Sequence, residues 1–251
     1  MRNFLLDDTV PKRPEGLSPL IVVQARMGST RLPGKVLKSL GERSMLAFLL
    51  DRLSQITPFV PVIVATTSDP RDEETVRCTD ECGVAHFCGS EEDVLDRFYR
   101  SSFGADTVIR ITADCPLSDP VLISKALDLF YHIGVDYLSN TLNRTYPRGF
   151  DVEIFSRKAL EEAFQKASSL SDREHVTGFI TSNSDLFSLA NFVDNEDMHD
   201  WRLTVDTKED LALLRRIVAE DRCGSYRQIK ELLRLHPEWK KINEFVKQKE
   251  T

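Results

Sequence analysis

The first half of the chain alternates short apolar runs with longer segments that carry helix signals. Four mainly apolar runs are predicted strands: 20–24, 61–66, 84–88 and 107–112. Four segments are predicted helices, either from apolar residues at helical spacing or from Ser and Asp caps: 44–56, 69–82, 91–103 and 119–132. This alternation predicts an α/β fold, in which a mostly parallel, twisted sheet has helices on both faces.

After Asn140 the alternation becomes irregular. The predicted features are a strand at Val152–Phe155, a helix from Ser156, a capping box at Ser171 and Glu174, a strand within 186–193, a buried strand at 201–206, a helix after it, and a charged helical tail at 225–251. We interpret 140–200 as an elaboration on one side of the sheet, within a single domain at 19–251. The charges and prolines of residues 1–18 predict a flexible arm.

Charge and hydropathy narrow the classes of function. The formal net charge is −7, and Lys and Arg are not concentrated anywhere as a nucleic-acid-binding surface requires. No apolar run reaches the roughly 18 residues of a membrane span, and the N-terminal segment lacks the features of a signal peptide. The sequence therefore predicts a cytoplasmic protein without nucleic-acid or membrane partners, whose one cationic loop holds a small anion.

Five cysteines at irregular spacing argue against a disulfide framework. Cys78, Cys82, His86 and Cys88 leave a zinc site open as an alternative. Zinc ligands usually flank a tight turn, whereas these residues fall on a predicted helix and the next strand. We therefore favour small buried thiols.

The cationic loop follows the first predicted strand, in the segment VVQARMGSTRLPGKV (22–36). It lacks the G-x-G-x-x-G of a dinucleotide loop, and its glycines are too far apart for a Walker loop, which also follows Lys with a hydroxyl residue. A wide loop in which Arg26, Arg31 and Lys35 converge on phosphates fits better, because Arg supplies a bidentate fork and Lys a point charge. A solvated basic loop is the alternative.

The loop also resembles the opening of the nucleotide-sugar cytidylyltransferases that activate acidic sugars, and most of all the branch of spore-coat polysaccharide biosynthesis proteins. Further motifs follow in the family's order, and the resemblance covers about residues 19–250: VATTSDPRDE, GSEEDVLDRFY, VIRITADCPLSDP, YPRGFDVEIF, REHVT and RLTVDTKEDL. The resemblance implies a nucleotidyltransferase fold of the glycosyltransferase-A-like type, with CTP as substrate, Mg²⁺ as cofactor and a homodimer as the assembly.

The same resemblance implies roles for individual residues. Arg26, Arg31 and Lys35 would hold the triphosphate, and Asp114 and Asp206 the metal. The nucleotide would contact Ala25, Gly28, Ser29, Gly34, Gly89, Ser90 and Thr112. Two carboxylates at adjacent strand ends also suit Mg²⁺ on chemical grounds. Capping of the following helix is the alternative role for Asp206, and helix capping the alternative for Ser90.

For the acceptor, the candidates are Tyr146, Asp151, Glu153, Arg173 and His175. Asp151 and Glu153 would share one face of a strand, opposite its apolar residues, which suggests a polar pocket. Arg148 is a further candidate for binding a carboxylate or phosphate. The alternatives are that Arg173 pairs with a nearby acid and that His175 packs on a helix face.

Together these observations predict a cytidylyltransferase that joins CMP to an acidic sugar or related acceptor in polysaccharide or glycoconjugate biosynthesis and releases pyrophosphate. No covalent nucleophile is expected, and Cys115, between Asp114 and Pro116, is interpreted as a packing residue. A metal-dependent glycosyltransferase and a non-catalytic nucleotide-binding scaffold are the alternatives. Glycosyltransferases of this architecture usually carry a D-x-D motif where this chain has Asp-Cys-Pro.

Overall fold

The structure is a computed structural model that describes residues 2–7, 9–221 and 224–248. Its main feature is an eight-stranded sheet, counted over those residues. In spatial order the strands are β1 (Arg2–Leu5), β10 (Leu189–Val193), β8 (Tyr137–Ser139), β9 (Glu153–Ser156), β7 (Thr107–Thr112), β2 (Pro19–Gln24), β5 (Val62–Thr67) and β6 (Ala85–Gly89). All neighbours are parallel except β9, which runs antiparallel to β7 and β8. The predicted α/β fold with a mostly parallel sheet is confirmed.

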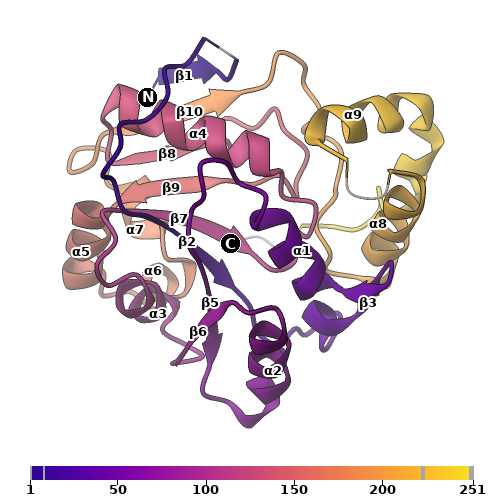
Figure 1. The fold of residues 1–251 in the computed structure, drawn as a ribbon, viewed down its shortest axis with the longest axis horizontal. Helices are drawn as coiled ribbons and strands as arrows, with labels where there is room; N and C mark the ends of the chain where they lie inside the picture. The colour runs from indigo at the N-terminus through magenta and orange to yellow at the C-terminus, as the bar shows by residue number, and fades with distance from the viewer. Residues whose placement is uncertain (1, 8, 222–223, 249–251) are drawn as a thin grey trace.

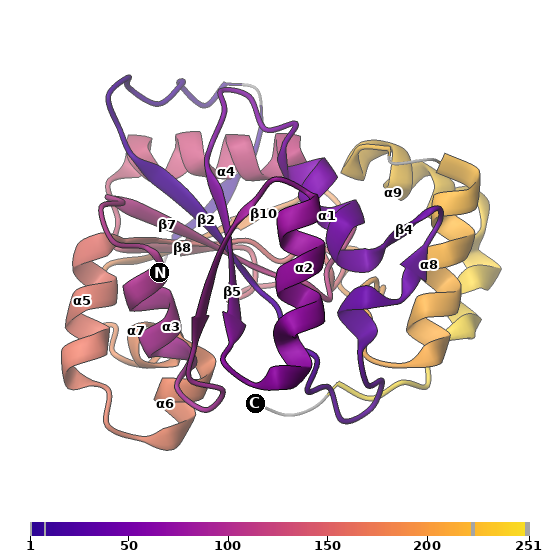
Figure 2. The same cartoon turned by 60° about the horizontal axis from the view of Figure 1, so that its bottom comes forward.

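Helices cover both faces of this sheet (Figures 1 and 2). One face packs against α1 (Met45–Leu53), α4 (Pro120–Ile133), α8 (Lys208–Asp221) and α9 (Tyr226–Leu235), with α2 (Glu73–Glu81) beside them. The other face packs against α3 (Val94–Ser101), α5 (Arg157–Lys166) and α7 (Gly178–Ser182), with α6 (Leu170–His175) adjoining α3. Short elements complete the fold: η1 (Lys35–Leu37), β3 (Ser39–Leu40), β4 (Arg43–Ser44), η2 (Pro70–Asp72) and η3 (Pro237–Ile242).

Several predicted caps are present, and others are displaced. Ser44 and Asp119 cap α1 and α4 as expected. The capping box expected at Ser171 is wrong, because Ser169 caps α6 by accepting from the backbone N–H of Asp172. Asp93 caps α3, which therefore begins at Val94, later than expected.

The N-terminal residues form part of the sheet, so the expected flexible arm is wrong for the part that the structure describes. β1 pairs in parallel with β10 at the edge of the sheet. Farther along, Arg13 and Lys12 form ion pairs with the buried carboxylate of Asp128 on α4. A buried carboxylate needs such a partner, which explains why this segment is held against the body.

The 140–200 segment also enters the sheet, so the expected elaboration on one side of it is corrected. It supplies β9, between β8 and β7, and β10, beside β1. Sequence periodicity predicted the strand at β9 but carried no signal for its antiparallel direction or for β8.

The predicted strand at 201–206 is wrong, although most of the segment is buried. It forms one isolated bridge, between Arg202 and Arg148. The backbone carbonyl of Arg148 accepts from Leu203, and the carbonyl of Asp114 accepts from Val205. The backbone groups of this segment are therefore divided between two neighbours, and no continuous ladder forms.

Gly149 allows this docking. Its φ is +109°, and a Cβ there would lie 2.4 Å from the carbonyl oxygen of Leu203. The conformation and the close approach both require glycine.

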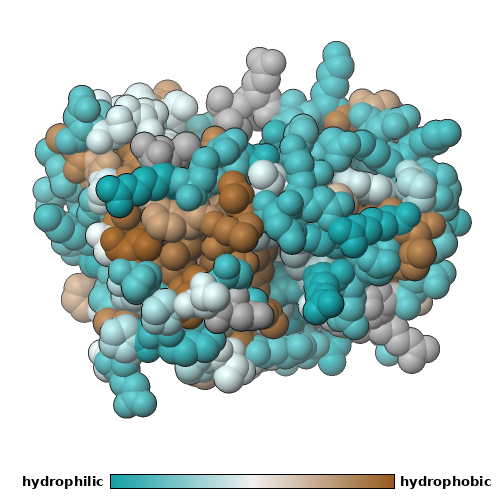
Figure 3. All heavy atoms as spheres, turned by 90° about the horizontal axis from the view of Figure 1, so that it is seen from above, coloured by the Kyte–Doolittle hydropathy of each residue, from teal (hydrophilic) through white to brown (hydrophobic). Residues whose placement is uncertain are grey.

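The face that carries β1 gathers apolar side chains (Figure 3). A cavity of about 360 Å³ beside β1 is lined by residues that include Phe4, Ile133, Val135 and Phe187. Of the helices in the described residues, none has the length and apolar character needed to cross a membrane.

Candidate active site

The carboxyl ends of four parallel strands form one edge of the sheet. Gln24 of β2 is level with Ala65 of β5 and Thr112 of β7, and Thr67 of β5 is level with Gly89 of β6. Open α/β sheets bind their ligands at this edge. The nucleotide candidates Ala25, Gly28, Ser29, Gly34, Gly89, Ser90 and Thr112 all lie at or just beyond these strand ends.

The loop after β2 is a wide turn closed by backbone contacts. The carbonyl of Met27 accepts from the N–H groups of Ser29 and Gly34, and the N–H of Met27 donates to Asp72 at 2.6 Å. Gly34 has a φ of +64° and precedes the single turn η1. The expected wide loop is therefore present, and backbone hydrogen bonds set its shape.

Lys35 lies at the centre of the site. Its ammonium Nζ is 2.7 Å from Asp114 Oδ2, 2.9 Å from Asp206 Oδ1 and 2.9 Å from the carbonyl oxygen of Val205. The two aspartates expected to hold a metal thus lie on either side of one cation. They come from the end of β7 and from the irregular 201–206 segment, which are far apart in sequence.

Electrostatics keep all three groups charged. Burial disfavours the charged form of Lys35, but the two carboxylates outweigh it and raise its pKa. Burial likewise opposes ionisation of Asp114 and Asp206, but Lys35 lowers the pKa of both, with added hydrogen bonds from Thr112 to Asp114 and from Arg202 to Asp206. The site therefore holds two carboxylates and an ammonium, all ionised at neutral pH.

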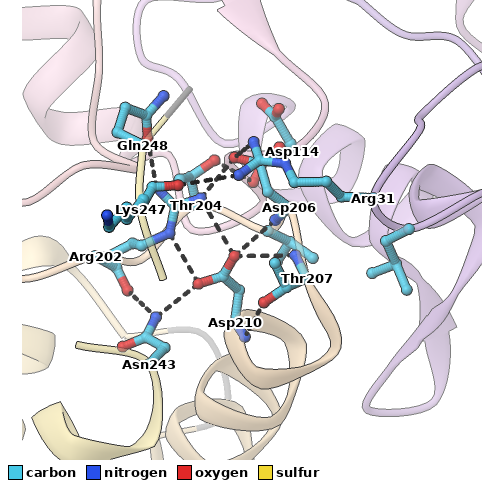
Figure 4. A network of polar contacts seen from close by, with 12 residues as sticks. Arg31, Asp114, Arg202, Thr204, Asp206, Thr207, Asp210, Asn243, Lys247 and Gln248 are labelled. Carbon is cyan, nitrogen blue, oxygen red and sulfur yellow. Dashed lines mark hydrogen bonds and ion pairs between the residues drawn. The ribbon is translucent and has the colours of Figure 1, made fainter. Parts of the chain in front are cut away.

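A second group of contacts holds Asp206 from the opposite side (Figure 4). Its Oδ2 is 2.8 Å from Arg31 and 2.6 Å from Arg202. Arg202 also pairs with the fully buried Asp210 at 2.9 Å. Arg202 and Asp210 stand in the motif RLTVDTKEDL, but no role was expected for either from the sequence.

The C-terminal segment adjoins the same network (Figure 4). Arg31 donates to the carbonyl of Lys247 at 3.2 Å, and Arg202 donates to the side chain of Gln248. Asn243 donates to the carbonyl of Arg202 and to Asp210. The end of the described chain therefore packs against the active-site edge.

Asp206 does not cap the helix that follows it. Thr207 does so: its hydroxyl accepts from the N–H of Asp210, while the Asp210 carboxylate accepts from the N–H groups of Asp206 and Thr207. The capping alternative for Asp206 is therefore wrong, and its carboxylate faces Lys35.

Arg26 lies apart from Arg31 and Lys35. Its guanidinium is 3.7 Å from Glu91, on the β6 side of the edge, whereas Arg31 and Lys35 meet at Asp206. The expected convergence of all three cations holds for two of them. The hydroxyl of Ser90, near Glu91, accepts from the N–H of Asp93 just before α3; the helix itself is capped by Asp93, so the capping alternative for Ser90 is wrong.

Glu153, an acceptor candidate, is almost fully enclosed. Its carboxylate pairs with Arg110 and accepts hydrogen bonds from Tyr137 and Thr177, at 2.7 and 2.6 Å. Arg110 in turn donates to Gln24 at 3.1 Å, at the start of the cationic loop. This buried network links the acceptor side to the loop, and it leaves Glu153 little surface for a ligand.

Three further acceptor candidates, Tyr146, Asp151 and Arg173, are engaged within the protein. Tyr146 is buried among Phe192 and Tyr226, so it belongs to the core and the expected pocket role is corrected. Asp151 pairs with Arg144. Arg173 pairs with Asp93 at 3.0 Å and lies over the Phe164 ring, which is the structural alternative named for it.

His175 is half-buried and precedes Val176, whose φ of +60° is unusual for a β-branched residue. The N–H of Thr177 donates to the carbonyl of His175 at 2.6 Å, which closes a strained three-residue turn. The turn directs the Thr177 hydroxyl to Glu153. His175 takes part in this turn through its backbone carbonyl.

Arg148 remains available for a ligand. No hydrogen bond or ion pair to its guanidinium occurs within the described residues, and Arg144 and Arg202 add positive charge nearby. Burial, followed by Arg144, lowers its pKa, while Asp151 acts in the opposite direction. An unpaired cation beside other cations is a suitable place for an anionic ligand.

The cysteines do not form a metal site in the described part of the chain. Cys82 and Cys88 are exposed, contrary to the expectation of buried thiols, and His86 pairs with Asp80 at 2.9 Å. Cys223 lies outside the described residues. Burial, and next the charge of Asp114, raises the pKa of Cys115 well above its usual value, so its thiol stays protonated and is a poor nucleophile.

The Lys35 site fits a magnesium ion by its donor chemistry. Asp114 and Asp206 present ionised oxygen ligands close together, which Mg²⁺ prefers. Among the described residues no group of three or more His, Cys, Asp and Glu side chains can hold a metal, so further ligands would have to be water and nucleotide oxygens. Lys35 now lies between the carboxylates, and it would have to turn away for both to bind one ion.

The sequence matches the protein family described as Cytidylyltransferase over residues 20–250. It is 38% identical over 234 residues to the Uncharacterized protein MJ1063 of Methanocaldococcus jannaschii, an alignment that covers 91% of this chain and 95% of that protein. It is 34% identical over 201 residues to the spore coat polysaccharide biosynthesis protein SpsF of Bacillus subtilis, which covers 76% of this chain and 82% of that protein.

A solved structure of a cytidylyltransferase from Leptospira borgpetersenii is similar to this chain over almost its whole length. The match covers 94% of this chain and 100% of the Leptospira chain, with a TM-score of 0.87 and 30% sequence identity. The comparison confirms the nucleotidyltransferase fold, and with the family match it favours nucleotidyl transfer over the glycosyltransferase alternative.

Proposed function

The chain belongs to the cytidylyltransferase family, and from this we propose that it transfers CMP from CTP to a small anionic acceptor, an acidic sugar, and releases pyrophosphate. One observation carries the proposal: the ammonium of Lys35 lies between Asp114 and Asp206 at the carboxyl edge of the sheet, directly after the phosphate loop. We place this reaction in the cytoplasm and in surface polysaccharide biosynthesis, which the likeness to SpsF supports.

In the proposed reaction an acceptor oxygen attacks the α-phosphorus of CTP, and the bond to the β-phosphate breaks. The acceptor hydroxyl loses its proton, and pyrophosphate takes up the bond's electron pair. Arg31 and Lys35 bind the phosphates and offset the charge that develops on the leaving group. Asp114 and Asp206 would hold Mg²⁺, which neutralises phosphate charge when bound. Lys35 would then leave the carboxylates and contact the phosphates.

We assign the acceptor's negative charge to Arg148. It is the guanidinium that the described structure leaves unpaired on the acceptor side, near Arg144 and Arg202. Its backbone is fixed by the contacts of 145–150 with Trp201 and Leu203. Arg202, whose backbone bridges to that of Arg148, pairs with Asp206, so a carboxylate or phosphate bound at Arg148 would lie on the same side as Asp206.

Pyrophosphate release tests this function. The protein is incubated with Mg²⁺, each of the four nucleoside triphosphates and a panel of acidic and neutral sugars. Release should require CTP and an acidic sugar together. Release with UTP and no acidic sugar, or transfer from a nucleotide sugar, would contradict the proposal.

The Arg148 assignment has its own test. Arg148→Met should raise the KM for the acceptor about tenfold or more and leave the KM for CTP unchanged, because only a ground-state contact is lost. Arg148→Lys keeps the charge and should recover much of the loss. Normal acceptor kinetics for Arg148→Met would contradict the assignment. The expected homodimer is a separate proposal, which the molar mass in solution tests.

A further inference from the structure

Arg97 of α3 is a buried cation without a partner. Its side chain is fully buried, and Nε and both terminal guanidinium nitrogens lack any hydrogen-bond partner within the described residues. The chain satisfies comparable groups elsewhere: Arg52, also buried, donates to the carbonyls of Leu117, Ser118 and Gly224. Because buried polar groups in proteins are nearly always paired, a fully unpaired guanidinium needs an explanation.

Three acids lie close enough to Arg97 to influence its pKa, but each is engaged with another group. Asp72 accepts from Met27 and Thr67, Asp93 pairs with Arg173, and Glu91 faces Arg26 and Arg71. Burial, and next the positive charge of Arg26, lower the pKa of Arg97 to about 10. The guanidinium groups of Arg26 and Arg97 thus lie in the same region. A ligand with hydrogen-bond acceptor atoms would offset the free-energy cost of burying Arg97 unpaired.

The side chain of Arg97 lies against Gly89 at the end of β6. A Cβ on Gly89 would lie 2.8 Å from Cγ of Arg97 and 3.0 Å from Cε1 of Phe87. β6 is the third strand from β7, and Asp114 follows the end of β7 by two residues, so the ends of these two strands are about 14 Å apart at a strand spacing of about 4.8 Å. That separation is too large for one phosphate group, but it suits the two ends of a nucleotide.

We propose that Arg97 recognises the base of the nucleotide by donating to two adjacent acceptors, the O2 and N3 atoms of cytosine. The inference rests on the proposed function, which places the phosphates at Lys35. A guanidinium only donates hydrogen bonds, so it matches cytosine, whereas N3 of uracil carries a hydrogen and opposes it. Arg97 therefore selects CTP and rejects UTP by the same contact.

The base would enter where Glu91 now lies. Glu91 Oε1 is 2.8 Å from the position of a Cβ on Gly28, so its carboxylate rests against the phosphate loop. Glu91 is half-exposed and belongs to no helix or strand, so it can move without disturbing the core. Its displacement would open the way from the loop to Arg97.

Nucleotide affinities test the proposal. Dissociation constants for CTP, UTP and inorganic tripolyphosphate are measured with Mg²⁺ by calorimetry for the full chain and for Arg97→Met. Arg97→Met should weaken CTP binding about ten- to a hundredfold and leave tripolyphosphate binding unchanged, whereas UTP binding should stay the same or become tighter, so the preference for CTP is lost. Its melting temperature should not fall, because an unpaired buried charge is replaced by an apolar side chain of similar length.

Arg100→Met is the matched control, since Arg100 lies on the same helix, exposed and paired with Asp96. It should change none of the affinities. If Arg97→Met does not fold, Arg97→Lys, which keeps the charge but loses the bidentate fork, should still reduce the preference for CTP over UTP.

An equal loss for CTP, UTP and tripolyphosphate would overturn base recognition in favour of a phosphate contact. Unchanged affinities in a folded variant would assign Arg97 to the fold. A wild-type chain that binds no nucleotide would instead overturn the proposed function, and this inference with it.

Discussion

Gly149 makes the docking of the 201–206 segment testable. Gly149→Ala introduces two costs: an L side chain at a φ of +109°, and a Cβ 2.4 Å from a backbone oxygen that cannot turn aside. Strain of this kind costs about 1–3 kcal/mol, and overpacking adds about 1–3 kcal/mol. We expect a loss of about 4 kcal/mol, or a fall in melting temperature of about 10 °C for a chain of this size.

Gly104→Ala is the matched control. Gly104 has a φ of +87°, but nothing lies within 4 Å of its added Cβ, so that variant carries the strain without the clash. The difference between the two melting temperatures, measured by calorimetry, isolates the close approach to Leu203. Equal losses for the two variants would refute the reasoning. A large loss should also reduce nucleotide affinity, because the docked segment carries Asp206.

Three further outcomes follow from the side-chain contacts. Lys35→Ala should weaken CTP binding about ten- to a hundredfold in calorimetry, and unchanged affinity would remove Lys35 from the site. Arg173→Ala should lower the melting temperature without raising the acceptor KM, because Arg173 pairs with Asp93; a raised KM at normal stability would restore its acceptor role. Glu153 has a lowered pKa despite its burial, owing to Arg110, so it contributes stability above its unfolded-state value of 4.5, and this contribution is lost as pH falls through the folded-state pKa. Acid unfolding of Glu153→Gln should show a weaker pH dependence in this range, and an unchanged curve would contradict the assignment.

The sequence predicted the parts of the fold that depend on local pattern. β2, β5, β6 and β7 lie close to the predicted strands, because a buried parallel strand is a short apolar run between turn signals. The caps at Ser44 and Asp119 were also predicted, because Ser and Asp are favoured at the residue that precedes a helix. β8 and the direction of β9 were not, because a strand of three or four residues carries little periodicity and none of it encodes direction.

The 201–206 segment shows why burial and strand structure differ. Its apolar residues pack in the core, which gives the pattern of a strand, but its backbone partners are Arg148 and Asp114 on two separate elements. The hydropathy pattern predicts that the side chains are buried, but it does not predict which backbone groups pair with this segment.

For the site, the family resemblance carried most of the prediction, because it implied Lys35 for the triphosphate and Asp114 and Asp206 for the metal. Strand topology accounts for Asp114 beside the loop, since parallel strand ends meet at one edge, whereas Asp206 lies there on a segment that forms no strand. Arg202 and Arg97 were missed, since an arginine's role depends on which acceptors the folded chain leaves beside it. Tyr146 shows the converse: a polar residue within a recognised motif packs in the core.

The affinity of the protein for CTP as a function of Mg²⁺ concentration tests the central claim most directly. Wild type, Asp114→Asn and Asp206→Asn are compared by calorimetry, since Asn preserves shape and removes charge. If both carboxylates serve one ion beside Lys35, Mg²⁺ should tighten CTP binding to the wild type, and each variant should lose most of that dependence, with the double variant little worse. Normal Mg²⁺ dependence in both single variants would contradict the account.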